Sequence, residues 1–291
     1  LTILINPLMS CSARLPVYIL LAGAFFGPKA GNVIFSVYFL GIVLAILMGR
    51  LFRSTLLRGE VAPFVMELPP YRLPMLKSLL IHMWDRAKIF LKKMGGVILV
   101  GSVVVWVLST YPRTVDYSVN YEARINQLQN RYEVMIGEVS PSIRDALREE
   151  RDKRISALEA RRSRETVERS YMGRMGKTLA PVLEPIGIDW RGTVAVLSGF
   201  VAKEIVVSTM GVLYAVGGDE VRKSEALKSS LRKSMTPLSA YAMMVFVLIY
   251  VPCLATVAVI RRETNSWKWA LFSMGYSTAL AWVVAFVIYQ G

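Results

Sequence analysis

Residues 31–51 read GNVIFSVYFLGIVLAILMGRL, an apolar stretch that carries no charged side chain until Arg50. The hydrocarbon core of a bilayer is about 30 Å thick and a helix rises about 1.5 Å per residue, so roughly 20 apolar residues are needed to cross it. A single segment in hydrocarbon must be helical, because only a helix pairs its own backbone N–H and C=O groups. The stretch therefore predicts a membrane-spanning helix.

Further apolar blocks lie on both sides of this one, with charged residues between them. They are a broken segment over residues 1–26 and the stretches Val97–Tyr111, Gly192–Val216, Leu238–Ile260 and Trp269–Tyr289. We interpret each block as helical. Of the whole chain, 54% is hydrophobic, above the roughly 45–50% of soluble domains. The fold class that we predict is all-α: a polytopic helical membrane protein with broken helices, an interfacial amphipathic helix and an extramembrane helical hairpin.

The net charge of +14 would suggest a nucleic-acid partner if the protein were soluble. Here the basic residues flank the apolar blocks, where they set membrane orientation, so we exclude nucleic acid as a partner. The only two cysteines, Cys11 and Cys253, lie inside apolar segments, which argues against a disulfide framework. Because the chain begins without Met inside an apolar run, we expect it to be a segment of a longer protein.

A basic connector joins the second and third apolar blocks. Residues 75–94 have apolar side chains at helical spacing and a basic polar face, which predicts an amphipathic helix on an anionic leaflet. Gly95 and Gly96 follow and offer a hinge into the next span. Upstream, Glu67 lies in an irregular proline-rich stretch, where we favour an anchoring role over one at an entrance.

Residues 112–176 differ in composition, because basic and acidic residues occur there in nearly equal number. Apolar residues recur at helical spacing in two segments, so we predict an antiparallel helical hairpin outside the bilayer and assign it no chemistry. The chain then divides into three parts. Residues 1–111 hold the broken first helix, the second span, the connector and the third span; residues 112–176 are the hairpin; and residues 177–291 hold the last membrane helices.

Lys203 and Glu204 interrupt the fourth block near its middle. A charge at the centre of a membrane helix costs about 2.5–3.5 kcal/mol on insertion scales, so such residues have a reason to be there. One reading is an ion or substrate site at the bilayer midplane. The others are a structural pair that holds helices together and a segment that does not cross the membrane.

The first apolar segment is broken between Pro7 and Pro16 by small polar residues. Interrupted backbone at membrane depth is tolerated only where it faces protein or a water-filled cavity. Ser10, Cys11 and Ser12 lie in this break. A thiolate from Cys11 would suit a borderline or soft metal, although a buried cysteine is more often a small apolar side chain.

Pro252 directly precedes Cys253, and it should kink the fifth block and free a carbonyl group near the thiol. The sequence has no P-loop, no dinucleotide-binding glycine run, no His-Glu-x-x-His and no nucleophile elbow. We therefore identify no catalytic centre and expect no enzyme activity.

Four motifs, in this order, resemble signatures of the bacterial ferrous-iron transporter family FeoB. They are PLMSCSARLPVY at 7–18, MELPPYRLP at 66–74, GFVAKEIVV at 199–207 and YVPCLAT at 250–256. Members of this family carry a cytoplasmic GTPase domain, a helical linker and a permease with two gate repeats. The resemblance covers the C-terminal part of the permease and implies that residues 177–291 contain the second gate repeat. The GTPase domain and the first gate repeat are absent from this chain.

The resemblance implies ferrous-iron uptake, with Fe2+ as the transported ion and no permanently bound cofactor. GTP would bind only in the missing domain. The implied partners are the lipid bilayer, the GTPase domain of the full-length protein and small cytoplasmic accessory proteins of iron uptake. The implied location is the bacterial cytoplasmic (inner) membrane, which the chain would cross several times.

By the same resemblance, Cys11, Glu204 and Cys253 would bind the ion. Ser10, Ser12 and Lys203 would line its path, with Lys203 neutralising Glu204 when the site is empty. The residues to which we assign structural or gating roles are Glu67, Pro16, Pro252, Gly95 and Gly96.

Two other functions remain open. Gate-type segments also occur in carriers of nucleosides and other small solutes, although two cysteines in broken helices favour a metal. The second alternative is a non-transporting membrane scaffold or sensor that binds a partner through the hairpin.

Overall fold

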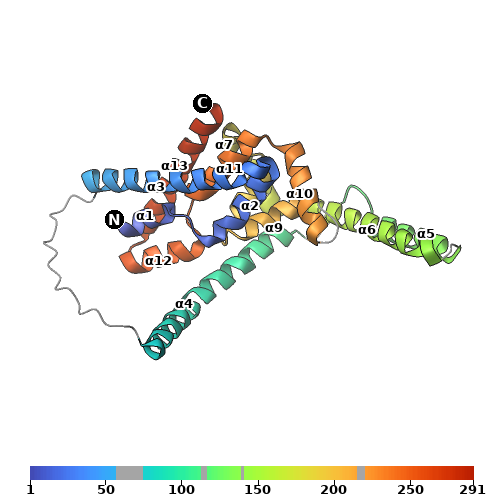
Figure 1. Cartoon of the computed structure of the whole chain (residues 1–291), viewed down its shortest axis with the longest axis horizontal. Helices are drawn as coiled ribbons and strands as arrows, with labels where there is room; N and C mark the ends of the chain where they lie inside the picture. Colours follow the sequence, from blue (N-terminus) through green and yellow to red (C-terminus); the bar gives the residue numbers. More distant parts are fainter. Residues whose placement is uncertain (57–74, 113–116, 139–140, 215–219) are drawn as a thin grey trace.

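The computed structural model describes residues 1–56, 75–112, 117–138, 141–214 and 220–291. Within these ranges all regular structure is helical (Figure 1). The α-helices are α1 Thr2–Ile5, α2 Leu15–Phe25, α3 Ala30–Thr55, α4 Leu76–Thr110, α5 Tyr121–Glu138, α6 Pro141–Arg169, α7 Tyr171–Leu183, α8 Trp190–Ser198, α9 Ile205–Leu213, α10 Glu220–Ser234, α11 Pro237–Ile249, α12 Leu254–Thr264 and α13 Trp267–Gln290. Short 3-10 turns η1 Asn6–Leu8, η2 Ser12–Arg14, η3 Gly27–Lys29 and η4 Glu184–Ile186 connect some of them.

Four helical stretches among the described residues are long and apolar enough to cross a membrane. They are Thr2–Phe25, Gly27–Thr55, Pro237–Thr264 and Trp267–Gln290. A shorter apolar helix, Ile98–Thr110, forms the second half of α4. The predicted class, an all-α multi-pass membrane protein, is confirmed.

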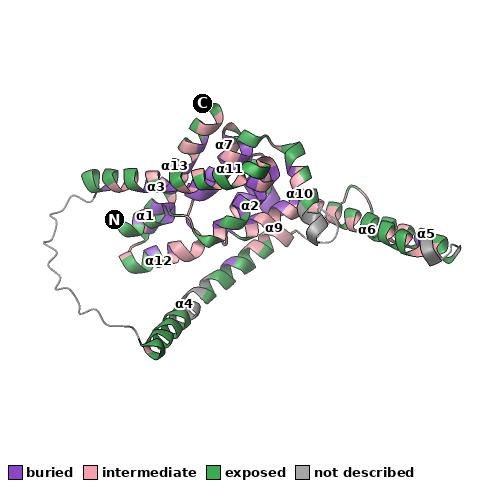
Figure 2. Ribbon diagram, in the orientation of Figure 1, coloured by how far each residue is buried: buried purple, intermediate pink, exposed green. Residues whose placement is uncertain are grey.

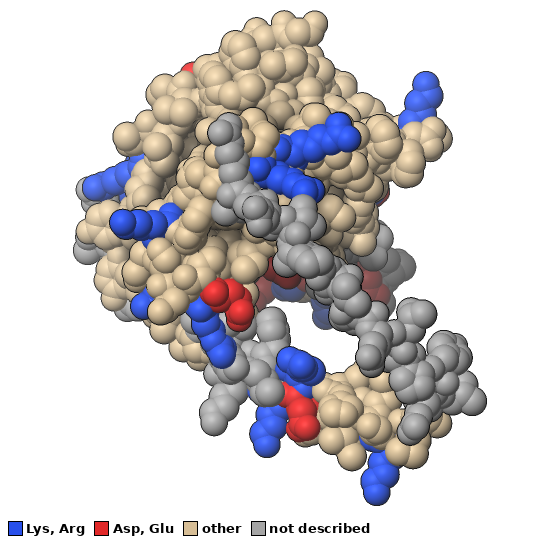
Figure 3. Space-filling view, turned by 90° about the vertical axis from the view of Figure 1, so that its left-hand side faces the viewer, with Lys and Arg blue, Asp and Glu red and all other residues tan. Residues whose placement is uncertain are grey.

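Helix α11 lies at the centre of the helical body. Every residue from Ala242 to Tyr250 is buried, and α2, α3 and α13 pack around α11. Figure 2 shows buried residues gathered in this part of the molecule. The Thr236 hydroxyl accepts from the Ser239 backbone N–H at 3.1 Å, and Pro237 follows the cap at the first helical position. This combination is typical of a helix start. The outer faces of α3 and α13 are apolar and exposed, for example at Phe35 and Val287, as expected of surfaces that meet lipid. Figure 3 shows one face of this body, on which uncharged side chains dominate.

The described part of the block Gly192–Val216, which we interpreted as helical, lies in two helices of nine residues each, α8 and α9. Residues 199–204 between them are not helical. The block is therefore helical, as we interpreted it, but it is broken at Lys203 and Glu204. Hydropathy marks the block as apolar and does not reveal the break. The helical backbone is interrupted where the buried Lys203 side chain donates a hydrogen bond to the end of α11.

The connector differs from expectation in its second half. Helix α4 is continuous over 35 residues and passes through Gly95 and Gly96 without a break. Two glycines lower helix stability by only about 1 kcal/mol each, which the rest of a long helix offsets. A gating role for these exposed glycines stays a prediction, and Glu67 lies outside the described residues.

Helices α5 and α6 lie side by side and project from the body (Figure 1). Glu165 of α6 accepts three hydrogen bonds at the base of this pair, from the Ser118 backbone N–H at 2.8 Å, the Ser118 hydroxyl at 3.1 Å and the Tyr121 hydroxyl at 2.9 Å. Farther along, Arg162 pairs with Glu122 across the two helices at 3.2 Å. The position of this pair outside the bilayer, and the division of the chain into 1–111, 112–176 and 177–291, stay predictions.

Candidate functional site

Three interruptions of the helices meet at one cavity of about 400 Å³. The first lies between η1 and η2, the second between α8 and α9, and the third between α11 and α12. The polar and sulfur-bearing residues that line the cavity are Asn6, Met9, Ser10, Cys11, Arg14, Lys203, Glu204, Cys253 and Thr256, and Pro252 lies beside them. Segments separated by about two hundred residues in sequence therefore share one space.

Arg14 holds the first interruption in place. Its side chain is buried, and its guanidinium donates to the carbonyl oxygens of Met9 at 2.9 Å and Pro7 at 2.8 Å. These bonds close the loop around Cys11, whose backbone is extended and whose side chain is exposed. Sequence reasoning missed this role. The only available signal was an arginine within a broken apolar segment, where a buried charge needs partners.

Lys203 holds the second interruption against the third. It is only 2% exposed, and its Nζ donates to the carbonyl oxygens of Val247 at 3.2 Å and Tyr250 at 3.5 Å. The ammonium also lies 3.8 Å from the centre of the Tyr250 ring. The last carbonyl groups of a helix lack partners and carry partial negative charge, so the C-terminal end of α11 is a favourable place for a cation.

This geometry corrects the expected pairing of Lys203 with Glu204. Within the part of the chain that the structure describes, no carboxylate lies within ion-pair distance of Lys203. Lys203 is buried, whereas Glu204, the next residue, is exposed at the cavity. The backbone of α11, not a carboxylate, compensates the buried ammonium.

Two further hydrogen bonds fix the second and third interruptions to each other. The Leu254 backbone N–H donates to the Phe200 carbonyl oxygen at 3.0 Å, and the Tyr250 hydroxyl donates to the Val196 carbonyl oxygen at 3.2 Å. Pro252 has no N–H and ends the regular hydrogen-bond pattern of α11, as its position predicted. Gly199 lets the segments approach, since a Cβ atom there would lie 2.5 Å from the Tyr250 hydroxyl.

Helix α4 passes close to the second and third interruptions. A Cβ atom on Gly101 would lie 2.8 Å from a methyl group of Leu254 and 2.9 Å from one of Val201. Ile98, one turn earlier, lines the cavity. The absence of a side chain at Gly101 therefore allows α4 to form one wall of the site.

The three predicted metal ligands line the same cavity but do not converge. Cys11 and Cys253 are both free thiols, and Cys253 lies 3.3 Å from the Thr256 hydroxyl. Across the described residues, no group of three or more His, Cys, Asp or Glu side chains is close enough together to hold a metal ion. The arrangement resembles a lined path more than a closed coordination shell, and metal binding by Cys11, Glu204 and Cys253 stays a prediction.

The remaining predicted residues lie in different places. Ser10 lines the cavity, whereas Ser12 is exposed in η2 and does not line it. Pro16 occupies the first turn of α2, where a proline is compatible with a helix.

The fold and the cavity define a multi-pass helical membrane protein whose broken helices enclose a polar and thiol-lined space. A family model described as "Nucleoside recognition" (Gate) matches residues 91–267, and one described as "Ferrous iron transport protein B C terminus" matches residues 34–86. The chain belongs to the FeoB family, as its motifs predicted. This membership agrees with the multi-pass inner-membrane location that we expected.

Several relatives agree with this assignment. A Fe(2+) transport protein A/Fe(2+) transporter FeoB fusion protein of Porphyromonas gingivalis is 48% identical over 100% of this chain and 34% of its own length. The Fe(2+) transporter FeoB of Methanocaldococcus jannaschii is 41% identical over 99% of the chain and 36% of its own length, and that of Staphylococcus aureus is 35% identical with the same coverage. The chain thus spans about a third of the length of these relatives. No solved structure matches.

Proposed function

We propose that this chain forms the membrane path of a ferrous-iron uptake transporter and that Fe2+ passes through the cavity between the three helix interruptions. The observation that carries the proposal is the placement of Cys11, Glu204 and Cys253 around one space, although they are far apart in sequence. Thiolate and carboxylate suit a divalent first-row ion, and the broken backbone supplies carbonyl oxygens as well.

The charges around the cavity support this reading. Arg14 and Lys203 would repel a divalent cation, but both are directed at backbone carbonyl oxygens. Glu204 is the one carboxylate among the described lining residues, and its side chain is exposed. It supplies the negative charge that an incoming ion needs when it loses water. The two thiols then replace part of the lost hydration.

Labelling of the two cysteines tests this proposal on the chain itself, since no other cysteine is present. We expect Fe2+ to slow alkylation of Cys11 and Cys253 by a maleimide under anaerobic conditions, whereas Mg2+, which prefers oxygen ligands, should not. Glu204→Gln should weaken the protection. Glu263→Gln is the matched control, because Glu263 is an exposed carboxylate on α12 outside the cavity. Equal alkylation rates with and without Fe2+ would overturn the proposal.

The whole transporter would include partners that this chain lacks. The GTPase domain of the full-length protein would bind GTP, so this chain would not act as an enzyme or hold a permanent cofactor. The Porphyromonas relative is named as a fusion of FeoB with Fe(2+) transport protein A. That fusion supports an accessory protein as a partner here.

A nucleoside carrier is the second candidate, because the gate model carries the description "Nucleoside recognition". The cavity has two thiols, and its two cationic side chains already bond to backbone carbonyl oxygens, which favours the metal. Competition separates the two functions: nucleosides at millimolar concentration should leave Fe2+ protection of the cysteines unchanged. Displacement of Fe2+ by a nucleoside would favour the carrier.

A further inference from the structure

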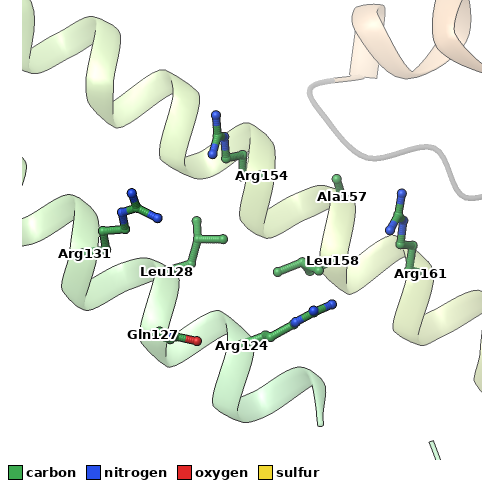
Figure 4. Close-up of a pocket in the computed structure, with 8 residues that line it drawn as sticks. All are labelled: Arg124, Gln127, Leu128, Arg131, Arg154, Ala157, Leu158 and Arg161. Atoms are coloured by element: carbon green, nitrogen blue, oxygen red, sulfur yellow. The ribbon is translucent and has the colours of Figure 1, made fainter. Parts of the chain in front are cut away.

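Four arginines surround a groove between α5 and α6 (Figure 4). The groove has a volume of about 420 Å³ and lies on the projecting helix pair, away from the cavity described above. The arginines are Arg124 and Arg131 on α5 and Arg154 and Arg161 on α6. Leu128 and Leu158 lie between them.

The arginines form two opposed pairs. On each helix the two arginines are seven residues apart, which is two turns, so they lie on one face with about 10 Å of helix between them. Figure 4 shows Arg124 on the side of Arg161, and Arg131 on the side of Arg154. The groove therefore presents two guanidinium pairs, one near each end.

Charge pairing in the groove differs from that on the rest of the helix pair. Elsewhere several arginines have acidic partners, as in Arg148–Asp145, Arg151–Asp152 and Arg162–Glu122. In the groove, Arg154 pairs with Glu150 at 2.6 Å. No described carboxylate pairs with the other three arginines, and none lines the groove. Like charges that line one groove repel one another, so a bound anion would stabilise the arrangement.

We propose that this groove is a binding site for a ligand with two or more phosphate groups. The planar guanidinium fork matches phosphate oxygens in a bidentate way, and arginine is more weakly hydrated than lysine. The two arginine pairs are separated by two helical turns. A ligand with several phosphates, which can reach both ends of the groove, should therefore bind better than orthophosphate. A soluble oligophosphate and a phospholipid headgroup share this chemistry.

Titration of the purified chain in neutral-lipid nanodiscs with tripolyphosphate tests the site. We expect tripolyphosphate to bind more tightly than orthophosphate, and Arg124→Gln/Arg161→Gln to weaken its binding about tenfold or more, because two charge-assisted contacts are lost. Arg148→Gln/Arg151→Gln is the matched control. It removes the same charge from the same helix pair outside the groove and should change the affinity by less than about twofold, in line with screening of distant surface charge.

Two further measurements complete the design. Arg124→Lys/Arg161→Lys keeps the charge without the fork and should lose an intermediate amount of affinity, while circular dichroism checks that each variant is folded. In nanodiscs that contain cardiolipin, which carries two phosphates, a lipid ligand would weaken tripolyphosphate binding to the parent chain but not to Arg124→Gln/Arg161→Gln. An unchanged affinity would identify the soluble source. Equal losses in the groove and control variants, equal affinities for the two phosphates, or no binding would overturn the proposal.

Discussion

Gly199→Ala tests whether the contact between the second and third helix interruptions holds the site together. The added Cβ would lie 2.4 Å from a Val206 methyl group and 2.5 Å from the Tyr250 hydroxyl oxygen. Neither neighbour can yield easily, because Val206 is fully buried and Tyr250 bonds to Val196 and stacks on Lys203. Overpacking of this kind destabilises by about 1–3 kcal/mol, and loss of the Tyr250 hydrogen bond adds about 1 kcal/mol. The smaller entropy of the unfolded alanine chain offsets about 0.4–1 kcal/mol of this.

We therefore expect Gly199→Ala to lower the free energy of unfolding by roughly 1–3 kcal/mol in total. Thermal unfolding in detergent measures it as a fall in Tm of several degrees. Gly211→Ala is the control, since that glycine lies on α9 with no atom within 4 Å of the added Cβ. There alanine should be neutral or stabilise the helix by up to about 1 kcal/mol.

A double-mutant cycle identifies the clash. Tyr250→Phe removes the hydroxyl that the new Cβ would meet, so Gly199→Ala should be less destabilising in the Tyr250→Phe background than in the parent. Equal Tm values for Gly199→Ala and Gly211→Ala, or fully additive effects in the cycle, would refute the close contact.

Two other predictions concern single side chains. Lys203→Met leaves the carbonyl oxygens at the end of α11 without their donor and should lower the free energy of unfolding by about 1.5–3 kcal/mol. Lys203→Arg should retain most of the parent stability. An unchanged or higher Tm for Lys203→Met would mean that the cost of desolvating the ammonium outweighs the free energy of its hydrogen bonds. Burial raises the pKa of Glu165, but hydrogen bonds from Ser118 and Tyr121 outweigh it and hold the pKa below its usual range. The stabilisation from Glu165 is therefore fully present above the pKa of an unfolded glutamate and is lost as pH falls through the lowered folded pKa. Glu165→Gln should remove this part of the acid sensitivity, measured by circular dichroism across an acid titration, and an unaltered acid transition would contradict it.

The long apolar helices were predictable from the sequence, because a single uninterrupted apolar segment in a membrane can pair its backbone groups only as a helix. The block that contains α3 shows this, and Pro252 correctly marked a break in another. The interruption between α8 and α9 was not predictable, because hydropathy reports composition and not the tertiary bond from Lys203 to α11. Gly95 and Gly96 suggested a hinge where α4 is in fact continuous, because the low helix propensity of two residues is small compared with the stability of a long helix.

The site could be predicted in part. Two cysteines near prolines and a Lys-Glu pair, all within apolar blocks, identified residues that line the cavity. Broken backbone and charged side chains at membrane depth are costly and therefore point to a function. Their meeting in space depends on long-range packing that no local pattern encodes. Arg14 was missed for a different reason, since its partners are nearby backbone carbonyl groups of Pro7 and Met9, and every residue type offers a carbonyl group.

Uptake of Fe2+ into proteoliposomes tests most directly whether the cavity is the ion path. The measurement compares Cys11→Ser, Cys253→Ser and Glu204→Gln with Glu263→Gln, all placed in the full-length transporter with its GTPase domain. We expect each of the three cavity variants to reduce the initial rate by about tenfold or more, because changes even to the outer-shell partners of metal ligands typically cost about 10–100-fold in affinity or activity. Glu263→Gln should transport at the parent rate. Parent-like uptake by all three cavity variants would contradict the assignment of the cavity as the path of Fe2+.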